Sequence, residues 1–125
     1  MNNAINWFEI PVKNFNRAKK FYETILGTPL TAHDDKNMPN DMKMAMLPCD
    51  RDGVGGAIVE TKGYEPSQKG VVIYLNGGKD LSVPLSKVEK AGGKIVMPKT
   101  SIGEYGFMAH FTDTEGNKLA FHSMK

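Results

Sequence analysis

The sequence has a single cysteine, Cys49, among its 125 residues. One cysteine excludes a disulfide within the chain and suits a reducing compartment, so we expect a cytoplasmic location. The sequence also lacks the run of about 20 apolar residues that a membrane span needs. Residues 1–7 (MNNAINW) lack the basic start and apolar centre of a secretory signal. We therefore expect a protein that neither crosses a membrane nor enters the secretory pathway.

An excess of one charge is missing as well. Lys and Arg number 16 against 14 Asp and Glu, the net charge is +2, and the lysines are scattered. Without a basic stripe we expect neither a nucleic acid nor an acidic membrane surface as a partner. Nothing resembles a Ser-His-Asp set, a phosphate-binding loop or a CxxC pair, so the sequence gives those chemistries no support.

A strand is predicted over residues 5–12 (INWFEIPV). Every second residue from Phe8 to Val12 is apolar and shares one face, whereas Trp7 and Glu9 lie on the other. A helix is predicted over residues 14–26, with apolar residues three and four positions apart and Asn14 or Asn16 as its cap. Gly27 and Pro29 then end this helix. The first part of the chain is thus a strand followed by an amphipathic helix.

The same order returns in residues 69–98. A strand over 71–76 leads through a glycine loop to a predicted helix over 82–91, for which Ser82 is the expected cap. Phe15 matches Leu81 and Gly27 matches Gly93, 66 residues apart in each case. A period near half the chain length indicates a duplicated unit.

Three strand-like runs follow each predicted helix. They cover residues 29–33, 42–47 and 56–60 in the first half, and 94–100, 106–112 and 118–123 in the second. Residues 113–117 (DTEGN) are a turn signal between the last two runs. The sequence therefore predicts one α+β domain of two βαβββ modules, the first about 1–66 and the second about 67–125.

Four stretches in this order resemble the glyoxalase / bleomycin-resistance protein / extradiol dioxygenase superfamily, which has the vicinal oxygen chelate fold. They are RAKKFYETILG (17–27), VEKAGGKIVMPK (88–99), IGEYGF (102–107) and DTEGNKLAFHS (113–123). The resemblance covers nearly the whole chain. It implies that the two sheets form an open barrel-like cavity with the helices on their outer face.

The resemblance also implies which residues line that cavity. Trp7 and Glu9 would point inward, while Phe8, Ile10 and Val12 would pack under the first helix. From the second module, the cavity would receive the side chains of Val72, Tyr74, Asn76, Ala120 and His122. Trp7 is expected to be buried on the cavity side and to offer a stacking surface for a planar ligand.

Metal-using members of the superfamily take ligands from the first and last strand of each module. By position these ligands fall on Trp7, Val72 and Ala120, none of which can donate a lone pair to a cation. In the remaining strand, residues 55–60 (GGAIVE), only Glu60 is a possible donor. We therefore expect no metal or other cofactor. The alternative is a displaced divalent metal held by Glu9 and His122.

Several further residues are ligand-binding candidates. Trp7, Tyr74 and Asn76 are expected in the cavity, and Tyr105 lies in a GEYGF loop that could close over its mouth. Met42, Met44 and Met46 share one face of one strand, either as core or interface packing or as an apolar wall of the cavity. His110 alternates with apolar neighbours, and either face of its strand could be the cavity face.

Three functions follow from these residues and the resemblance. The first is metal-free binding of a small organic molecule, as in the drug-resistance members. The second is an enzyme, a lactoylglutathione-lyase-like lyase or isomerase or a dioxygenase, with Glu9 and His122 as the catalytic residues, with or without a metal. The third is a structural subunit without a ligand, which the polar cavity residues disfavour. For each we expect a homodimer.

Overall fold

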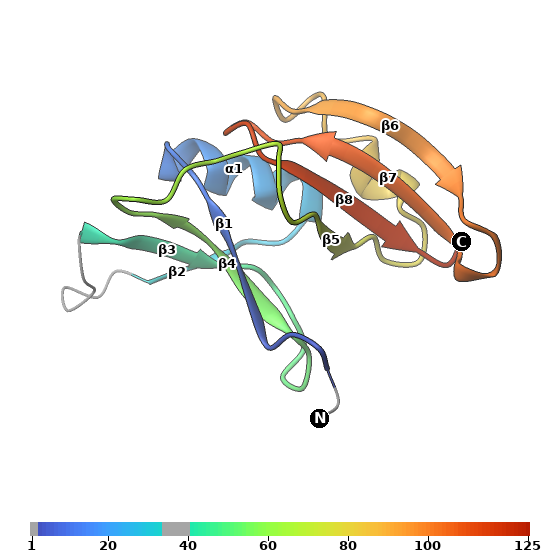
Figure 1. Ribbon diagram of the computed structural model, residues 1–125, viewed down its shortest axis with the longest axis horizontal. Helices are drawn as coiled ribbons and strands as arrows, with labels where there is room; N and C mark the ends of the chain where they lie inside the picture. The colour runs from blue at the N-terminus through green and yellow to red at the C-terminus, as the bar shows by residue number, and fades with distance from the viewer. Residues whose placement is uncertain (1–2, 34–40) are drawn as a thin grey trace.

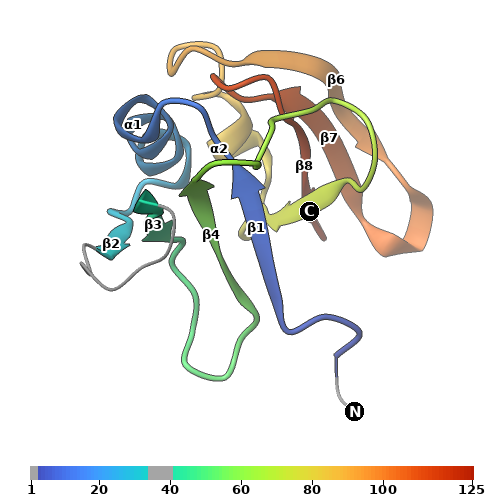
Figure 2. The same ribbon diagram turned by 60° about the vertical axis from the view of Figure 1, so that its left-hand side comes forward.

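The computed structural model describes residues 3–33 and 41–125 and contains two four-stranded sheets (Figures 1 and 2). The first module contributes a sheet in the order β1-β4-β3-β2, in which β1 runs parallel to β4 and the other neighbours are antiparallel. Its elements are β1 (Trp7–Pro11), α1 (Phe15–Leu26), β2 (Thr31–His33), β3 (Lys43–Met46) and β4 (Gly55–Glu60).

The second module repeats this plan with the order β5-β8-β7-β6, and β5 is parallel to β8. Its elements are β5 (Ile73–Asn76), α2 (Ser82–Leu85), β6 (Lys94–Ser101), the 3-10 turn η2 (Gly103–Tyr105), β7 (Phe107–Thr112) and β8 (Lys118–Ser123). The paired βαβββ modules are therefore confirmed, with strand ends mostly within two residues of the predicted ones. The expected boundary near residue 66 falls in the segment that joins β4 to β5.

The helix α1 begins and ends as its sequence predicts. The side chain of Asn14 accepts a hydrogen bond from the backbone N–H of Arg17, which caps the first turn. Gly27 takes a left-handed conformation with φ of 69° and donates its N–H to the Glu23 carbonyl. The Glu60 carboxylate accepts the N–H of Phe15, so β4 also caps this helix. No helix among the described residues is long and apolar enough to span a membrane.

The second helix is much shorter than predicted, because α2 ends at Leu85 instead of residue 91. Beyond it, the N–H groups of Lys87 and Val88 bond to carbonyls three residues earlier, as in tight turns. The prediction of Ser82 as the cap was also wrong. The Ser82 backbone N–H donates to the Asp80 carboxylate, so Asp80 supplies the oxygen that satisfies this turn.

One apolar core joins both modules. Ile10 and Ile58 come from the first sheet, Phe111 and Phe121 from the second, and all four are at most 1% exposed. Phe21 of α1 packs against Phe111 with ring centroids 6.3 Å apart. The helix α1 therefore packs against core residues of both modules. The sequence predicted only its packing against the first module.

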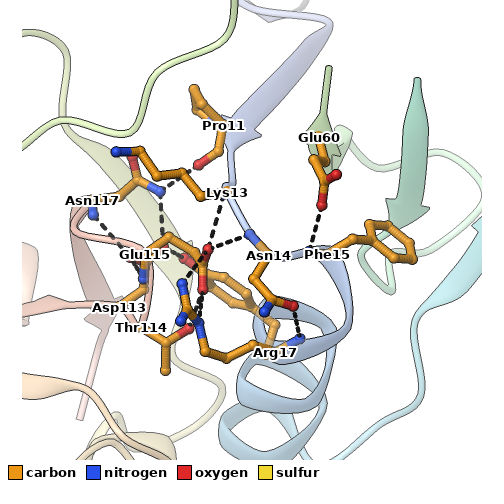
Figure 3. A network of polar contacts seen from close by, with 11 residues as sticks. Pro11, Lys13, Asn14, Phe15, Arg17, Glu60, Asp113, Thr114, Glu115 and Asn117 are labelled. Atoms are coloured by element: carbon orange, nitrogen blue, oxygen red, sulfur yellow. Dashed lines mark hydrogen bonds and ion pairs between the residues drawn. The ribbon is translucent and has the colours of Figure 1, made fainter. Parts of the chain in front are cut away.

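Hydrogen bonds and an ion pair from the DTEGN turn, residues 113–117, connect the second module to the first (Figure 3). The buried carboxylate of Glu115 accepts the N–H groups of Lys13 and Asn14 at 2.9 and 2.8 Å, and it pairs with the Arg17 guanidinium at 2.7 Å. Asn117 donates to the Pro11 carbonyl. The turn thus holds the junction between β1 and α1.

Candidate functional site

Each sheet has one face on the core and one face turned away from it, which we call the open face. In the first module the core face carries Ile10 and Ile58, which are cross-strand partners in β1 and β4. Residues that alternate with these two lie on the other side. The open face of module 1 therefore includes Trp7, Glu9, Met44, Met46, Ala57 and Val59, with Thr31 and His33 of β2 beside the two methionines.

In the second module the core face carries Leu75, Phe111 and Phe121, so the alternate residues form its open face. These residues are Tyr74 and Asn76 of β5, Met108, His110 and Thr112 of β7, and Lys118, Ala120 and His122 of β8. His110, whose face the sequence left undecided, thus lies beside the predicted candidates. The predicted cavity residue Val72 precedes β5.

On the open face of module 1, Glu9 is held by two donors. The Trp7 indole N–H donates to one carboxylate oxygen at 3.2 Å, and the Tyr64 hydroxyl donates to the other at 2.7 Å. The hydrogen bond and the negative charge of Glu9 raise the pKa of Tyr64 above its ordinary value. The contact with Tyr64, which comes from the segment after β4, was not predicted.

Trp7 lies on the predicted side of its strand, since Ile10 and Val12 are in the core and Trp7 is not. The prediction that it is buried was wrong, because 42% of the residue is exposed. Its ring lies against the backbone of Gly55, where an added methyl group would come within 3.4 Å of ring atom Cζ3. The open face of a single chain does not cover the indole.

On the open face of module 2, Tyr74 and His110 form a pair. The Tyr74 hydroxyl lies 3.0 Å from His110 Nε2, and the two rings are nearly perpendicular. Burial and then the positive charge of Lys118 lower the pKa of His110 below 6.5. The imidazole is therefore mainly neutral at neutral pH, while Tyr74 remains 48% exposed.

His122 Nε2 lies 2.6 Å from the backbone carbonyl oxygen of Tyr105. Because a carbonyl oxygen can only accept, His122 Nε2 carries a proton in this contact. Tyr105 as a whole residue is 68% exposed. Glu9 and His122 therefore have separate partners in separate modules, and one chain does not pair them with each other.

The candidate residues line different cavities at these faces. A groove of about 410 Å³ between the modules is lined by Trp7, Glu9 and Lys118, among others. A second cavity of about 580 Å³ is lined by Tyr74, Asn76 and His122. The cavity of about 870 Å³ at the ends of β1 and β5 includes Tyr74 and Asn76 but neither Glu9 nor His122. The first two cavities fit a small-molecule site that combines apolar walls with a few polar groups.

Comparison with known proteins identifies the family. Residues 4–121 match the model of the glyoxalase/bleomycin resistance protein/dioxygenase superfamily. The chain belongs to this superfamily. A glyoxylase-like domain-containing protein from Didymella fabae is 31% identical over 121 residues, which are 96% of this chain and 93% of the relative.

Several solved structures share the fold of this chain. A glyoxalase/bleomycin resistance protein from Albidiferax ferrireducens T118 superposes with a TM-score of 0.72 at 16% identity, covering 98% of this chain and 100% of the other. TnmS3, an antibiotic-binding protein from Streptomyces sp. CB03234, has a TM-score of 0.65 at 17% identity, covering 98% and 97%.

This chain lacks the donor residues that metal-using members of the superfamily place on these strands. The open-face neighbours of Trp7 and Glu9 on β4 are Gly55 and Ala57, which carry no donor. Glu60, the donor that the sequence left as a candidate, lies on the helix side and caps α1. Within residues 3–33 and 41–125, no three His, Cys, Asp or Glu side chains gather where they could hold a metal ion. Within one chain, the residues at these positions therefore do not form the ligand set of the superfamily's metal-using members.

Proposed function

We propose that the protein binds a small planar organic molecule on its open faces, without a metal, and that a second copy of the chain covers these faces. The observation that carries the proposal is the exposure of Trp7 and Tyr74, at 42% and 48%, on faces opposite the core. Exposed aromatic side chains on a sheet face offer stacking surfaces, and stacking contributes about 0.5–1.5 kcal/mol per pair.

The side chains around these aromatic residues support a binding role. Met44 and Met46 of module 1 and Met108 of module 2 lie on the open faces. Methionine has a flexible, polarisable side chain that adapts to ligands of different shape. Membership of a superfamily named for bleomycin resistance, and the shared fold of the antibiotic-binding TnmS3, favour a ligand of antibiotic or similar character.

Assembly as a homodimer is part of the proposal. An open face with exposed tryptophan and tyrosine and half-buried methionine side chains is typical of surfaces that bind a ligand or a partner. Twofold pairing would let the same surface cover itself on both copies. Sedimentation at micromolar concentration should give twice the mass of one chain, and a monomer would count against this part of the proposal. The cytoplasmic location expected from the single cysteine stays a prediction.

The enzymatic alternative rests on Glu9 and His122 as acid and base, with or without a divalent metal. It is less well supported, because Glu9 bonds to Trp7 and Tyr64 while His122 bonds to the Tyr105 carbonyl. A lyase, isomerase or dioxygenase reaction would need the two groups to meet at one substrate. Asn76 and Tyr105 remain candidates for ligand contacts.

The experiment uses the emission of Trp7, the only tryptophan in the chain. Titration with anthraquinone-2-carboxylate, a planar probe with acceptor oxygens, should quench this emission, whereas cyclohexanecarboxylate should not. By calorimetry, Trp7→Ala should weaken binding of the planar probe about tenfold, or about 1.4 kcal/mol. Val83→Ala, at an exposed apolar position on α2, is the matched control. Equal responses to both probes, or equal affinity in both variants, would reject the proposal.

A further inference from the structure

The pairing of Tyr74 with His110 depends on the residue between them. In the sheet order β5-β8-β7, the register aligns Tyr74 with Ala120 and Ala120 with His110. All three point to the open face, and Ala120 has only a methyl group. The two long side chains can therefore meet above Ala120, where the hydroxyl and Nε2 lie 3.0 Å apart.

The two tautomers of neutral His110 give this pair opposite properties. If Nδ1 carries the proton, Nε2 accepts the Tyr74 hydroxyl proton, and Tyr74 offers only lone pairs to a ligand. If Nε2 carries the proton, it donates to the Tyr74 oxygen. The hydroxyl proton of Tyr74 then has only Met108 Sδ, a weak acceptor 3.7 Å away, as a partner within the chain, and a ligand oxygen can take its place.

Burial of the other ring nitrogen favours the second tautomer. His110 Nδ1 is buried, and none of the described residues forms a hydrogen bond with it. A buried N–H without a partner is rare in proteins because its desolvation is not compensated. A buried lone pair on Nδ1 leaves no donor unpaired. We therefore assign the proton to Nε2.

The charges around the pair favour an electron-rich ligand atom. Lys118 lies on the same face from β8, and Lys94 of β6 is the register partner of Thr112 of β7. The residues on the open side of β5, β7 and β8, strands that the structure describes in full, include no carboxylate. Tyr74 is also exposed enough to be reached from solvent.

We propose that the Tyr74–His110 pair is a hydrogen-bond donor site for a negatively polarised ligand oxygen, such as a phenolate, a carboxylate or a quinone carbonyl. His110 holds the Tyr74 oxygen from behind, and Tyr74 donates its hydroxyl proton to the ligand. The site rests on the proposed function in one respect only, that the open face receives a ligand. It adds the chemistry of the ligand's polar end.

The first test needs no ligand. Long-range ¹H–¹⁵N correlation NMR distinguishes the Nε2–H and Nδ1–H tautomers of each histidine, and His110→Gln identifies the His110 signals. We expect the neutral Nε2–H form at pH 7. An Nδ1–H form, or a ring that is still protonated at pH 7, would overturn the proposal.

The second test uses 4-nitrophenol, whose phenol and phenolate forms absorb at different wavelengths. Binding at the donor site should increase the phenolate fraction, and Tyr74→Phe should abolish this change and weaken binding about tenfold, as expected for a hydrogen bond to a charged group. Val83→Ala, at an exposed position on α2 and away from both open faces, should leave both readouts unchanged. Failure of the dye to bind at millimolar concentration, or equal binding to Tyr74→Phe, would overturn the site.

The two proposals fail in different ways. The first case is that 4-nitrophenol binds equally to the wild type and to Tyr74→Phe, while anthraquinone-2-carboxylate still quenches the emission of Trp7. The donor-site proposal is then wrong and the binding function stands. If neither probe binds, both the function and the donor site are rejected, whatever tautomer the NMR experiment finds.

Discussion

The two modules share strand order and connectivity but present different chemistry on their open faces. Module 1 offers Trp7, two methionines and the carboxylate of Glu9, which already has two hydrogen bonds. Module 2 offers Tyr74 and Lys118, which can donate hydrogen bonds to a ligand, and His110, whose Nε2 lies 3.0 Å from the Tyr74 hydroxyl. A duplicated scaffold therefore supplies one mainly apolar surface and one donor surface, and a ligand that contacts both would need a planar body and an acceptor oxygen.

The two helices also differ in what holds their first turns. The turn of module 2 at residues 113–117 caps and clamps the start of α1, whereas α2 is a single helical turn held by Asp80. The longer helix thus depends on the other module for part of its stability. Substitutions can test this dependence directly.

The largest expected effect is that of Glu115→Ala. The side chain of Glu115 is fully buried, and its loss leaves the N–H groups of Lys13 and Asn14 without their acceptor. Urea denaturation should show a loss of about 3 kcal/mol in the free energy of unfolding. Arg17→Ala removes a side chain that is 51% exposed, so it should cost about 1 kcal/mol or less. Equal losses in the two variants would show that the surface ion pair, and not the buried carboxylate, matters.

The same residue predicts a pH dependence. Burial alone would raise the pKa of Glu115, but the hydrogen bonds from Arg17, Asn14, Thr114 and Lys13 outweigh it and lower the pKa below 4.5. A lowered pKa in the folded state means that the stabilisation is present above about pH 4.5 and is lost as the pH falls through the lower value. Glu115→Gln should therefore flatten the acid side of the stability curve. An unchanged acid limb would contradict this account.

A smaller difference is expected between Gly93→Ala and Gly27→Ala, the two glycines that match in the repeat. A methyl group at Gly93 would lie 2.5 Å from the Thr112 carbonyl and 2.8 Å from the Phe21 ring, so we expect a loss of about 1–3 kcal/mol from overpacking. At Gly27 it would approach only the end of Lys87, and the cost is about 1 kcal/mol from its positive φ. Thermal melts should place Gly93→Ala below Gly27→Ala. The reverse order would show that backbone conformation outweighs packing here.

The sequence predicts the features that repeat locally. The alternation from Phe8 to Val12 indicates the core face of β1, Asn14 indicates the helix start, and the predicted bounds of β8 agree with Lys118–Ser123. The length of α2 was overestimated because the tight turns beyond Leu85 bury Val88 as well as a longer helix would. Residue spacing alone does not separate these two cases.

The features that the sequence does not predict depend on contacts between distant segments. Glu115 meets Arg17 across 98 positions, and Tyr74 meets His110 only through the register of β5, β8 and β7. The exposure of Trp7 depends on what covers the open face, which its own strand does not determine. The only sequence feature that could have indicated the structural role of Glu115 is its position as an acidic residue in the turn after a strand.

The most direct test of metal-free binding is titration of Trp7 fluorescence with anthraquinone-2-carboxylate in parallel samples, one with EDTA and one with added Zn²⁺, Mn²⁺ or Ni²⁺. The positions where the resemblance places metal ligands carry Trp7, Val72 and Ala120, and the β4 neighbours of Trp7 and Glu9 are Gly55 and Ala57. None of these side chains binds a metal, so we predict the same affinity in every sample. Binding that disappears in EDTA and returns with one of these metals would contradict the account.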